Sequence, residues 1–133
     1  MALDLIIVED RPGIGRTLVT IAPLHNVKAI SFSSTKELLE YFERRAEEPL
    51  HYLVEFIGRG IMESNDATSN AQKLYNYLQT QQIPFRSFTL MGDYSSLEEA
   101  SARTEKISEI KHLPWLEKIR TDWGKYLDNL KNL

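Results

Sequence analysis

Short apolar runs alternate along the chain with longer segments in which apolar residues recur at helical spacing. The run from Leu3 to Val8 is unbroken from Leu5 onward and ends at two acidic residues, a pattern typical of a strand covered on both faces of a sheet. Similar runs predict further strands at 27–32, 52–57, 85–91 and 107–110. Because right-handed crossovers return successive strands in the same direction, this alternation predicts a parallel sheet.

Helices are predicted between these strands. The first begins near Pro12, whose missing N–H costs nothing in a first helical turn, and it ends near Pro23. The second follows a capping box formed by Ser34 and Glu37. A third lies around residues 74–78, and a weakly apolar fourth opens at residues 95 and 96.

The last helix has the clearest amphipathic pattern, and it is predicted to begin directly after residue 114. Its apolar positions are Trp115, Leu116, Ile119, Trp123, Tyr126, Leu127 and Leu130. We expect Trp115, Ile119 and Leu127 to pack in the core. Trp123 and Tyr126 lie at the margin of this stripe, where aromatic side chains are typical anchors of a protein interface.

These elements predict one flavodoxin-like domain over residues 1–133, a (βα)5 three-layer sandwich with a five-stranded parallel sheet of order 2-1-3-4-5. In such folds, functional residues collect at the carboxyl ends of the strands, near the point between strands 1 and 3 where the strand order reverses. The residues that end each strand are therefore the candidates for a site.

The composition of the chain excludes several classes of function. The chain has no cysteine, which excludes disulfides and thiolate chemistry. A net charge of -3 gives no general attraction to nucleic acid, and no apolar run is long enough for a membrane span. No basic-flanked signal run precedes the first strand, so we expect a cytoplasmic protein.

The residues around the end of the first strand resemble a known family. Val8 is followed by Glu9, Asp10 and Arg11, with Pro12 opening the next helix, and the segment 31–39 continues the likeness. The chain thereby resembles the response-regulator receiver (CheY-like) superfamily. The resemblance implies that Glu9 and Asp10 bind Mg²⁺, a cation that takes few protein oxygens. The alternative is that this acidic pair only ends a strand and favours the N-terminus of the next helix.

The resemblance also implies a nucleophilic aspartate at the end of the third strand, and the sequence lacks one there. No aspartate lies between Asp10 and Asp66. Depending on the register, the acceptor position falls on Ile57 or on Glu55. Isoleucine has no nucleophile, and glutamate would at best imitate a permanent negative charge. We therefore interpret the chain as a degenerate pseudo-receiver that lacks the phosphoacceptor.

Two more positions implied by the family are displaced. The threonine or serine expected at the end of the fourth strand is Thr89 when counted from Pro84, but the position falls on Met91 when counted back from the next helix. The lysine expected after the fifth strand is Lys111, although two residues separate it from Pro114 where the family has none.

These observations predict a regulatory module that works without phosphorylation and is not an enzyme. Its expected partners are proteins, such as a kinase, a regulator or an output protein. A homodimer through helix 4, strand 5 and helix 5 is also expected. No cofactor is expected apart from Mg²⁺ at Glu9 and Asp10. The alternative is a sensor of nucleotides or other small molecules at the carboxyl edge of strands 1 and 3, since Gly13, Gly15 and Arg16 follow the first strand.

Overall fold

The computed structural model describes residues 3–9, 13–42, 50–55, 70–92 and 113–132. Its strands are β1 (Leu5–Val8), β2 (Ala29–Phe32), β3 (Leu50–Glu55), β4 (Phe85–Gly92) and β5 (Trp115–Glu117). Its helices are α1 (Ile14–Ile21), α2 (Thr35–Phe42), α3 (Asn70–Thr80) and α5 (Trp123–Asn129), with the 3-10 turns η1 (Ala22–His25) and η3 (Leu130–Asn132).

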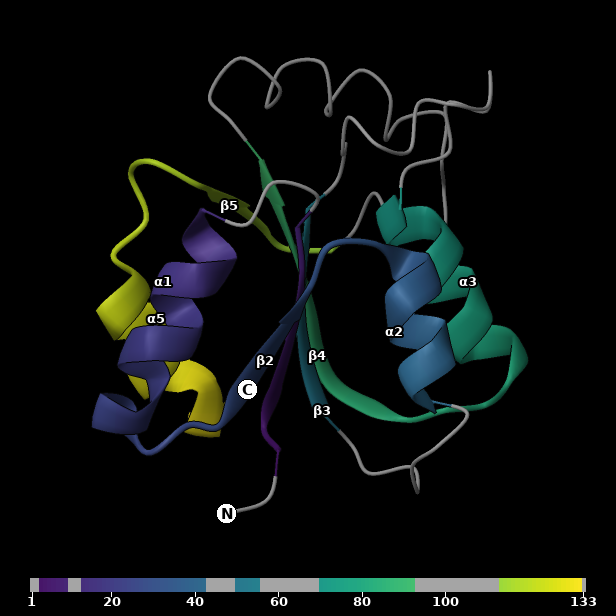
Figure 1. Cartoon of the computed structure of the whole chain (residues 1–133), viewed down its shortest axis with the longest axis horizontal. Coiled ribbons are helices and arrows are strands. Elements are labelled where there is room, and N and C mark those ends of the chain that lie inside the picture. Colours follow the sequence, from purple (N-terminus) through teal and green to yellow (C-terminus); the bar gives the residue numbers. More distant parts are fainter. Residues whose placement is uncertain (1–2, 10–12, 43–49, 56–69, 93–112, 133) are drawn as a thin grey trace.

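The strands form one parallel sheet of order β2-β1-β3-β4-β5, which confirms the predicted fold class. Helices α1 and α5 cover one face of this sheet, and α2 and α3 cover the other (Figure 1). All five carboxyl ends therefore point to the same edge, away from the N-terminus.

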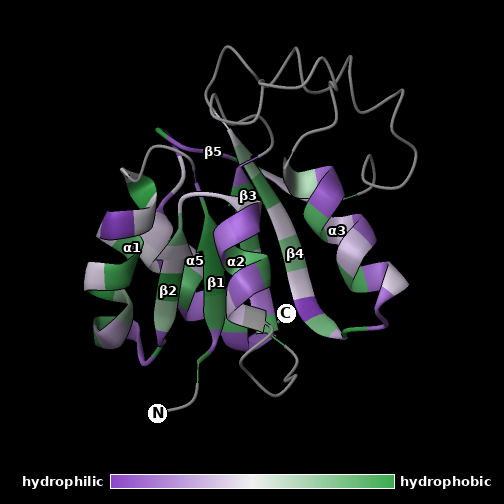
Figure 2. Ribbon diagram, turned by 45° about the vertical axis from the view of Figure 1, so that its right-hand side comes forward, coloured by the Kyte–Doolittle hydropathy of each residue, from purple (hydrophilic) through white to green (hydrophobic). Residues whose placement is uncertain are grey.

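The central strand explains why the apolar runs are continuous. All four residues of β1 have no exposed surface, because alternate side chains enter the two different cores. Ile6 and Val8 pack with α2 and α3, whereas Leu5 and Ile7 pack with α1 and α5. Figure 2 shows β1 as an unbroken hydrophobic strand in the middle of the sheet. At roughly 1.5 to 3 kcal/mol per fully buried large aliphatic side chain, this strand anchors both layers.

The predicted capping box before α2 forms, but the Glu37 carboxylate bonds to Ser33 and not to Ser34. The Glu37 amide donates to the Ser34 hydroxyl at 3.2 Å, as the motif requires. The Glu37 carboxylate, however, accepts from the amide and the hydroxyl of Ser33, at 3.1 and 2.9 Å. Two donors that would otherwise lack a partner at the start of this helix are satisfied in this way.

The prediction for the C-terminal third was wrong in its boundaries. Residues 115–117 form strand β5 and not the start of a helix, and α5 begins only at Trp123. Ile119, expected in the core, is 80% exposed. The predicted strand at 107–110 and the predicted helix at 95 lie outside the described residues. In those described, no helix is long and apolar enough to cross a membrane.

Candidate functional site

Two buried carboxylates and one lysine meet at the carboxyl edge of the sheet. Glu9 follows β1, Glu55 is the last residue of β3, and Lys118 follows β5. The pairing of Val8 with Val54 sets the two acids side by side. The Lys118 ammonium lies 2.6 Å from Oε2 of Glu9 and also forms an ion pair with Oε2 of Glu55. Three strands that are distant in sequence thereby share one charge cluster, Glu9–Lys118–Glu55.

The second oxygen of Glu9 holds the start of α1. Its Oε1 accepts hydrogen bonds from the amides of Gly13 and Gly15, at 3.0 and 2.8 Å. Gly13 is the N-cap residue and offers no side chain of its own. The Glu9 carboxylate therefore replaces a local cap, and its negative charge suits the positive end of the helix dipole.

Gly15 is required by the closeness of this contact. A Cβ atom at position 15 would lie 2.5 Å from Oγ of Ser31 and 3.2 Å from Oε1 of Glu9. Real Cβ atoms do not approach so closely, and Ser31 is fixed in β2. The absent side chain lets α1 pack against β1 and β2 while its amide reaches Glu9.

The electrostatics of the cluster depend on burial. The Glu9 and Glu55 side chains are 1% and 8% exposed, and that of Lys118 is 13% exposed. Burial alone would lower the pKa of Lys118, but hydrogen bonds and charge from Glu55 and Glu9 outweigh it and raise that pKa above its ordinary value. Lys118 thus stays charged, and removing it would take away the cation that pairs with both buried carboxylates.

The structure brings together only some of the residues predicted for the site. Glu9 and Glu55 lie in the cluster, whereas Asp10, Ile57 and Lys111 fall outside the described residues. Thr89 is buried in the middle of β4, opposite Leu53 of β3, and it is Met91 that lies opposite Glu55. Sequence reasoning missed Lys118, because the last helix was expected to include it.

Comparisons with known proteins identify the fold. No protein-family model matches the sequence, and no curated protein matches it. A response regulator receiver domain protein from Clostridium thermocellum matches with a TM-score of 0.65 at 13% identity, covering 98% of this chain and 95% of that one. Full-length FixJ from B. japonicum matches with a TM-score of 0.69 at 13% identity, over 99% of this chain and 59% of FixJ. A response regulator from Colwellia psychrerythraea matches with a TM-score of 0.55 at 20% identity, over 98% of both chains. The chain has the fold of a receiver domain.

The described residues of this receiver-like fold do not suit a magnesium ion. Glu9 has both oxygens engaged, one by two amides and the other by Lys118. No group of three or more histidine, aspartate or glutamate side chains with metal-ligand geometry occurs in the described part of the chain. The ammonium of Lys118 lies between the carboxylates of Glu9 and Glu55, in the place that a metal ion bridging these two residues would need.

The two aromatic residues predicted as interface anchors differ in their surroundings. Tyr126 is only 8% exposed and packs in the core formed by α1 and α5, so the prediction that it lies at the margin was wrong. Trp123 is half-buried, and its ring makes an edge contact with Tyr126 at 5.5 Å. Of the pair, Trp123 alone retains surface that a partner protein could contact.

Proposed function

We propose that this chain is a phosphorylation-independent regulatory module with a receiver-like fold, which acts through contact with a partner protein. The single observation that carries the proposal is the Glu9–Lys118–Glu55 cluster. An acyl-phosphate switch needs a free carboxylate nucleophile at the end of β3. Here the carboxylate at the end of β3 is a glutamate that is already paired with a buried lysine.

The Glu9–Lys118–Glu55 cluster supports a module that keeps one conformation and does not switch on phosphorylation. Lys118 balances one of the two buried negative charges, and Glu9 joins the same lysine to the start of α1. A phosphoryl group would add about two negative charges to this edge and would have to displace the ion pair. Regulation then falls to partner binding, oligomerisation or expression level, and no catalytic step is assigned to the chain.

The alternative function, nucleotide sensing at the carboxyl edge of β1 and β3, has less support. Phosphate-binding loops use free backbone amides at a helix N-terminus. In this chain the Gly13 and Gly15 amides already donate to Glu9, so an incoming phosphate would have to displace a buried carboxylate of the protein itself.

The proposal is tested with phosphoryl donors. The chain is incubated with acetyl phosphate and Mg²⁺, and separately with beryllofluoride and Mg²⁺, beside a phosphorylatable receiver domain as a control for the reagents. We expect no mass gain and no change in the amide spectrum of this chain, while the control responds. A magnesium-dependent modification of Glu55, or a shift of the amides around residues 55 and 118, would overturn the proposal.

Partner binding is tested on the surface next to the cluster. Trp123→Ala should weaken capture of the natural partner from the native cell, and it should weaken any homodimer seen by light scattering. Lys131→Ala is the matched control, because Lys131 is exposed on the following turn. If Trp123→Ala captures the natural partner as well as wild type does and has the same mass by light scattering, Trp123 is not part of the proposed interface.

A further inference from the structure

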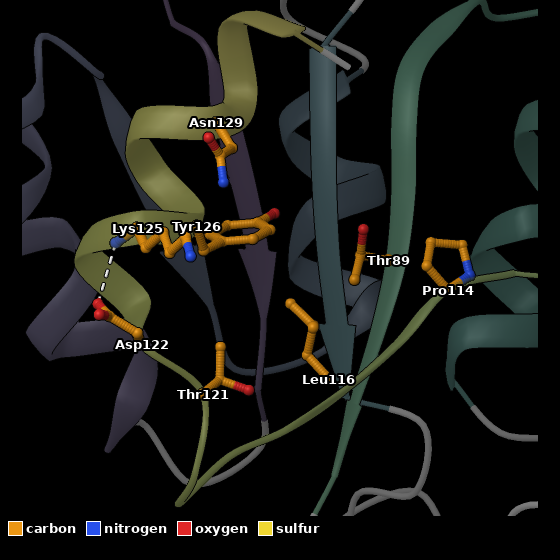
Figure 3. Close-up of a pocket in the computed structure, with 8 residues that line it drawn as sticks. All are labelled: Thr89, Pro114, Leu116, Thr121, Asp122, Lys125, Tyr126 and Asn129. Carbon is orange, nitrogen blue, oxygen red and sulfur yellow. Dashed lines mark hydrogen bonds between the residues drawn. The ribbon is translucent and has the colours of Figure 1, made fainter.

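A pocket of about 440 Å³ lies between α5 and the sheet, on the side of β4 and β5 (Figure 3). Pockets of this size accommodate small organic molecules. It is lined by Thr89, Pro114, Leu116, Thr121, Asp122, Lys125, Tyr126 and Asn129. None of these residues belongs to the Glu9–Lys118–Glu55 cluster, so the pocket is separate from the site described above.

The deep end of the pocket carries two hydroxyl groups. Tyr126 and Thr89 are 8% and 3% exposed, and Figure 3 shows the Tyr126 hydroxyl pointing across the pocket in the direction of Thr89. The Tyr126 hydroxyl is fully buried and makes no hydrogen bond of good geometry with the described residues. Because a buried polar group without a partner costs about 1 to 3 kcal/mol, a ligand oxygen that accepts from it would be favoured.

The Tyr126 hydroxyl is a donor at neutral pH. Burial raises the pKa of this phenol, and a weak hydrogen-bond interaction with the neighbouring Thr89 hydroxyl opposes that effect only in part. A protonated phenol can therefore donate to an oxygen placed beside it.

The walls and the rim of the pocket differ in character. Leu116 and Pro114 supply apolar walls beside the ring of Tyr126. At the rim, Lys125 is exposed and forms no ion pair with a described residue. Asp122, also at the rim, is the N-cap of α5 and accepts from the Lys125 amide at 3.0 Å. Among the described residues, the rim therefore offers one positive charge without an ion-pair partner, separated from the buried hydroxyls by an apolar surface.

We propose that this pocket binds a small carboxylic acid with a flat, ring-sized apolar body and an oxygen at the opposite end. The carboxylate pairs with Lys125, the ring lies against Leu116 and Tyr126, and the far oxygen accepts from the Tyr126 hydroxyl. This gives the receiver-like module a ligand site that does not depend on its strand-end cluster.

The test uses three probes that differ by one feature each. 4-Hydroxybenzoate has both the carboxylate and the far oxygen, its methyl ester lacks the charge, and benzoate lacks the far oxygen. Binding is followed by amide chemical shifts of residues 114–116 and 121–129 and by tryptophan fluorescence. We expect 4-hydroxybenzoate to bind about tenfold more tightly than either analogue, in keeping with one charged or buried hydrogen bond.

Variants assign each preference to a residue. Lys125→Met should abolish the preference for the acid over its ester, and Tyr126→Phe should abolish the preference for 4-hydroxybenzoate over benzoate. Lys131→Met, which changes an exposed lysine outside the pocket, should leave both preferences intact. No shift of the pocket amides at millimolar probe, equal affinity for all three probes, or preferences that persist in Lys125→Met and Tyr126→Phe would overturn the proposal.

Discussion

The indole nitrogen of Trp123 donates a hydrogen bond to the backbone carbonyl of Lys118, at 3.0 Å. This bond joins the start of α5 to the residue whose ammonium pairs with Glu9 and Glu55. The only aromatic side chain of α5 with partner-accessible surface among the described residues is thus one hydrogen bond from the charge cluster. Trp123 therefore links α5 directly to the backbone of Lys118.

Loss of this hydrogen bond should lower the stability slightly and change the structure only locally. Trp123→Phe keeps an aromatic ring and loses the donor, so we expect a loss of about 0.5 to 1.5 kcal/mol in the free energy of unfolding. The amide resonances near residues 55 and 118 should shift as well. Urea denaturation and an amide spectrum measure both effects, and unchanged resonances at these positions would show that the bond does not couple α5 to the cluster.

Loss of the lysine should be far more severe. Lys118→Met removes the cation that pairs with the buried carboxylates of both Glu9 and Glu55, which should lower the free energy of unfolding by about 3 to 5 kcal/mol. Chemical denaturation provides the measurement. Lys131→Met is the control, since an exposed lysine contributes within about 0.5 kcal/mol. Adding Glu55→Leu to Lys118→Met should restore part of the loss, and equal effects of Lys118→Met and Lys131→Met would contradict the account of the cluster.

The packing of α1 on β1 and β2 is tested by a matched pair of glycines. Gly15→Ala places a Cβ against Ser31 and Glu9, so it should cost about 1 to 3 kcal/mol, as overpacking does. Gly13→Ala meets no atom within 4 Å and should cost less. Thermal unfolding compares the two, and Ser31→Ala should rescue Gly15→Ala in part because it removes the nearest atom. A larger loss for Gly13→Ala would show that helix capping, and not close packing, dominates there.

The fold should lose stability above about pH 10. The ordinary pKa values of Lys118 and Tyr126 are 10.5 and 10.0, and both are raised in the folded protein. Above these values the unfolded chain releases protons that the folded chain keeps, so the free energy of unfolding falls as pH rises. Denaturation between pH 8 and 11 measures the decline, and Tyr126→Phe should make it shallower. An identical decline in that variant would show that Tyr126 does not contribute.

The buried histidine His51 should make the fold less stable as the pH falls into the acid range. Burial, followed by the positive charge of Arg86, lowers its pKa below the ordinary 6.5, although Asp4 opposes the shift. Below about pH 6.5 the unfolded chain binds a proton that folded His51 does not, so the free energy of unfolding falls with falling pH. The slope should be at most about 1.4 kcal/mol per pH unit.

His51→Gln is the matched variant for this measurement. Glutamine does not titrate and can still bond to the Ser87 hydroxyl, which lies 2.7 Å from His51 Nδ1. The difference between wild type and His51→Gln, followed by urea denaturation from pH 7.5 to 5.5, cancels all other titrating groups. A difference that does not change with pH would contradict the prediction.

The apolar pattern located the first four strands because each carries a long enough run with clear turn residues after it, although β3 begins at Leu50, two residues before the predicted start. The fifth was misplaced for a physical reason. β5 has only three residues, all half-buried, and its Trp115 and Leu116 stand at helical spacing from Ile119 and Trp123. One signal for the true boundary was present, since Asp122 is a good N-cap and its carboxylate does accept from Lys125.

The position of the fifth strand also decides which lysine belongs to the site. A strand at 107–110 makes Lys111 the expected lysine, whereas the lysine that follows β5 is Lys118. The position of Glu55 could not be settled from sequence either. It depends on the register of β3 against β1, where Val54 pairs with Val8, and apolar runs of similar composition allow either of two offsets.

The strands at the two borders of the sheet are among its shortest, four residues in β2 and three in β5. A border strand exposes backbone groups that another chain can extend into a continuous ladder, and a short border offers too few of them for stable growth. The brevity of these two border strands therefore limits edge-to-edge pairing of the sheet, and Pro114 and Glu117 at the β5 border act in the same direction.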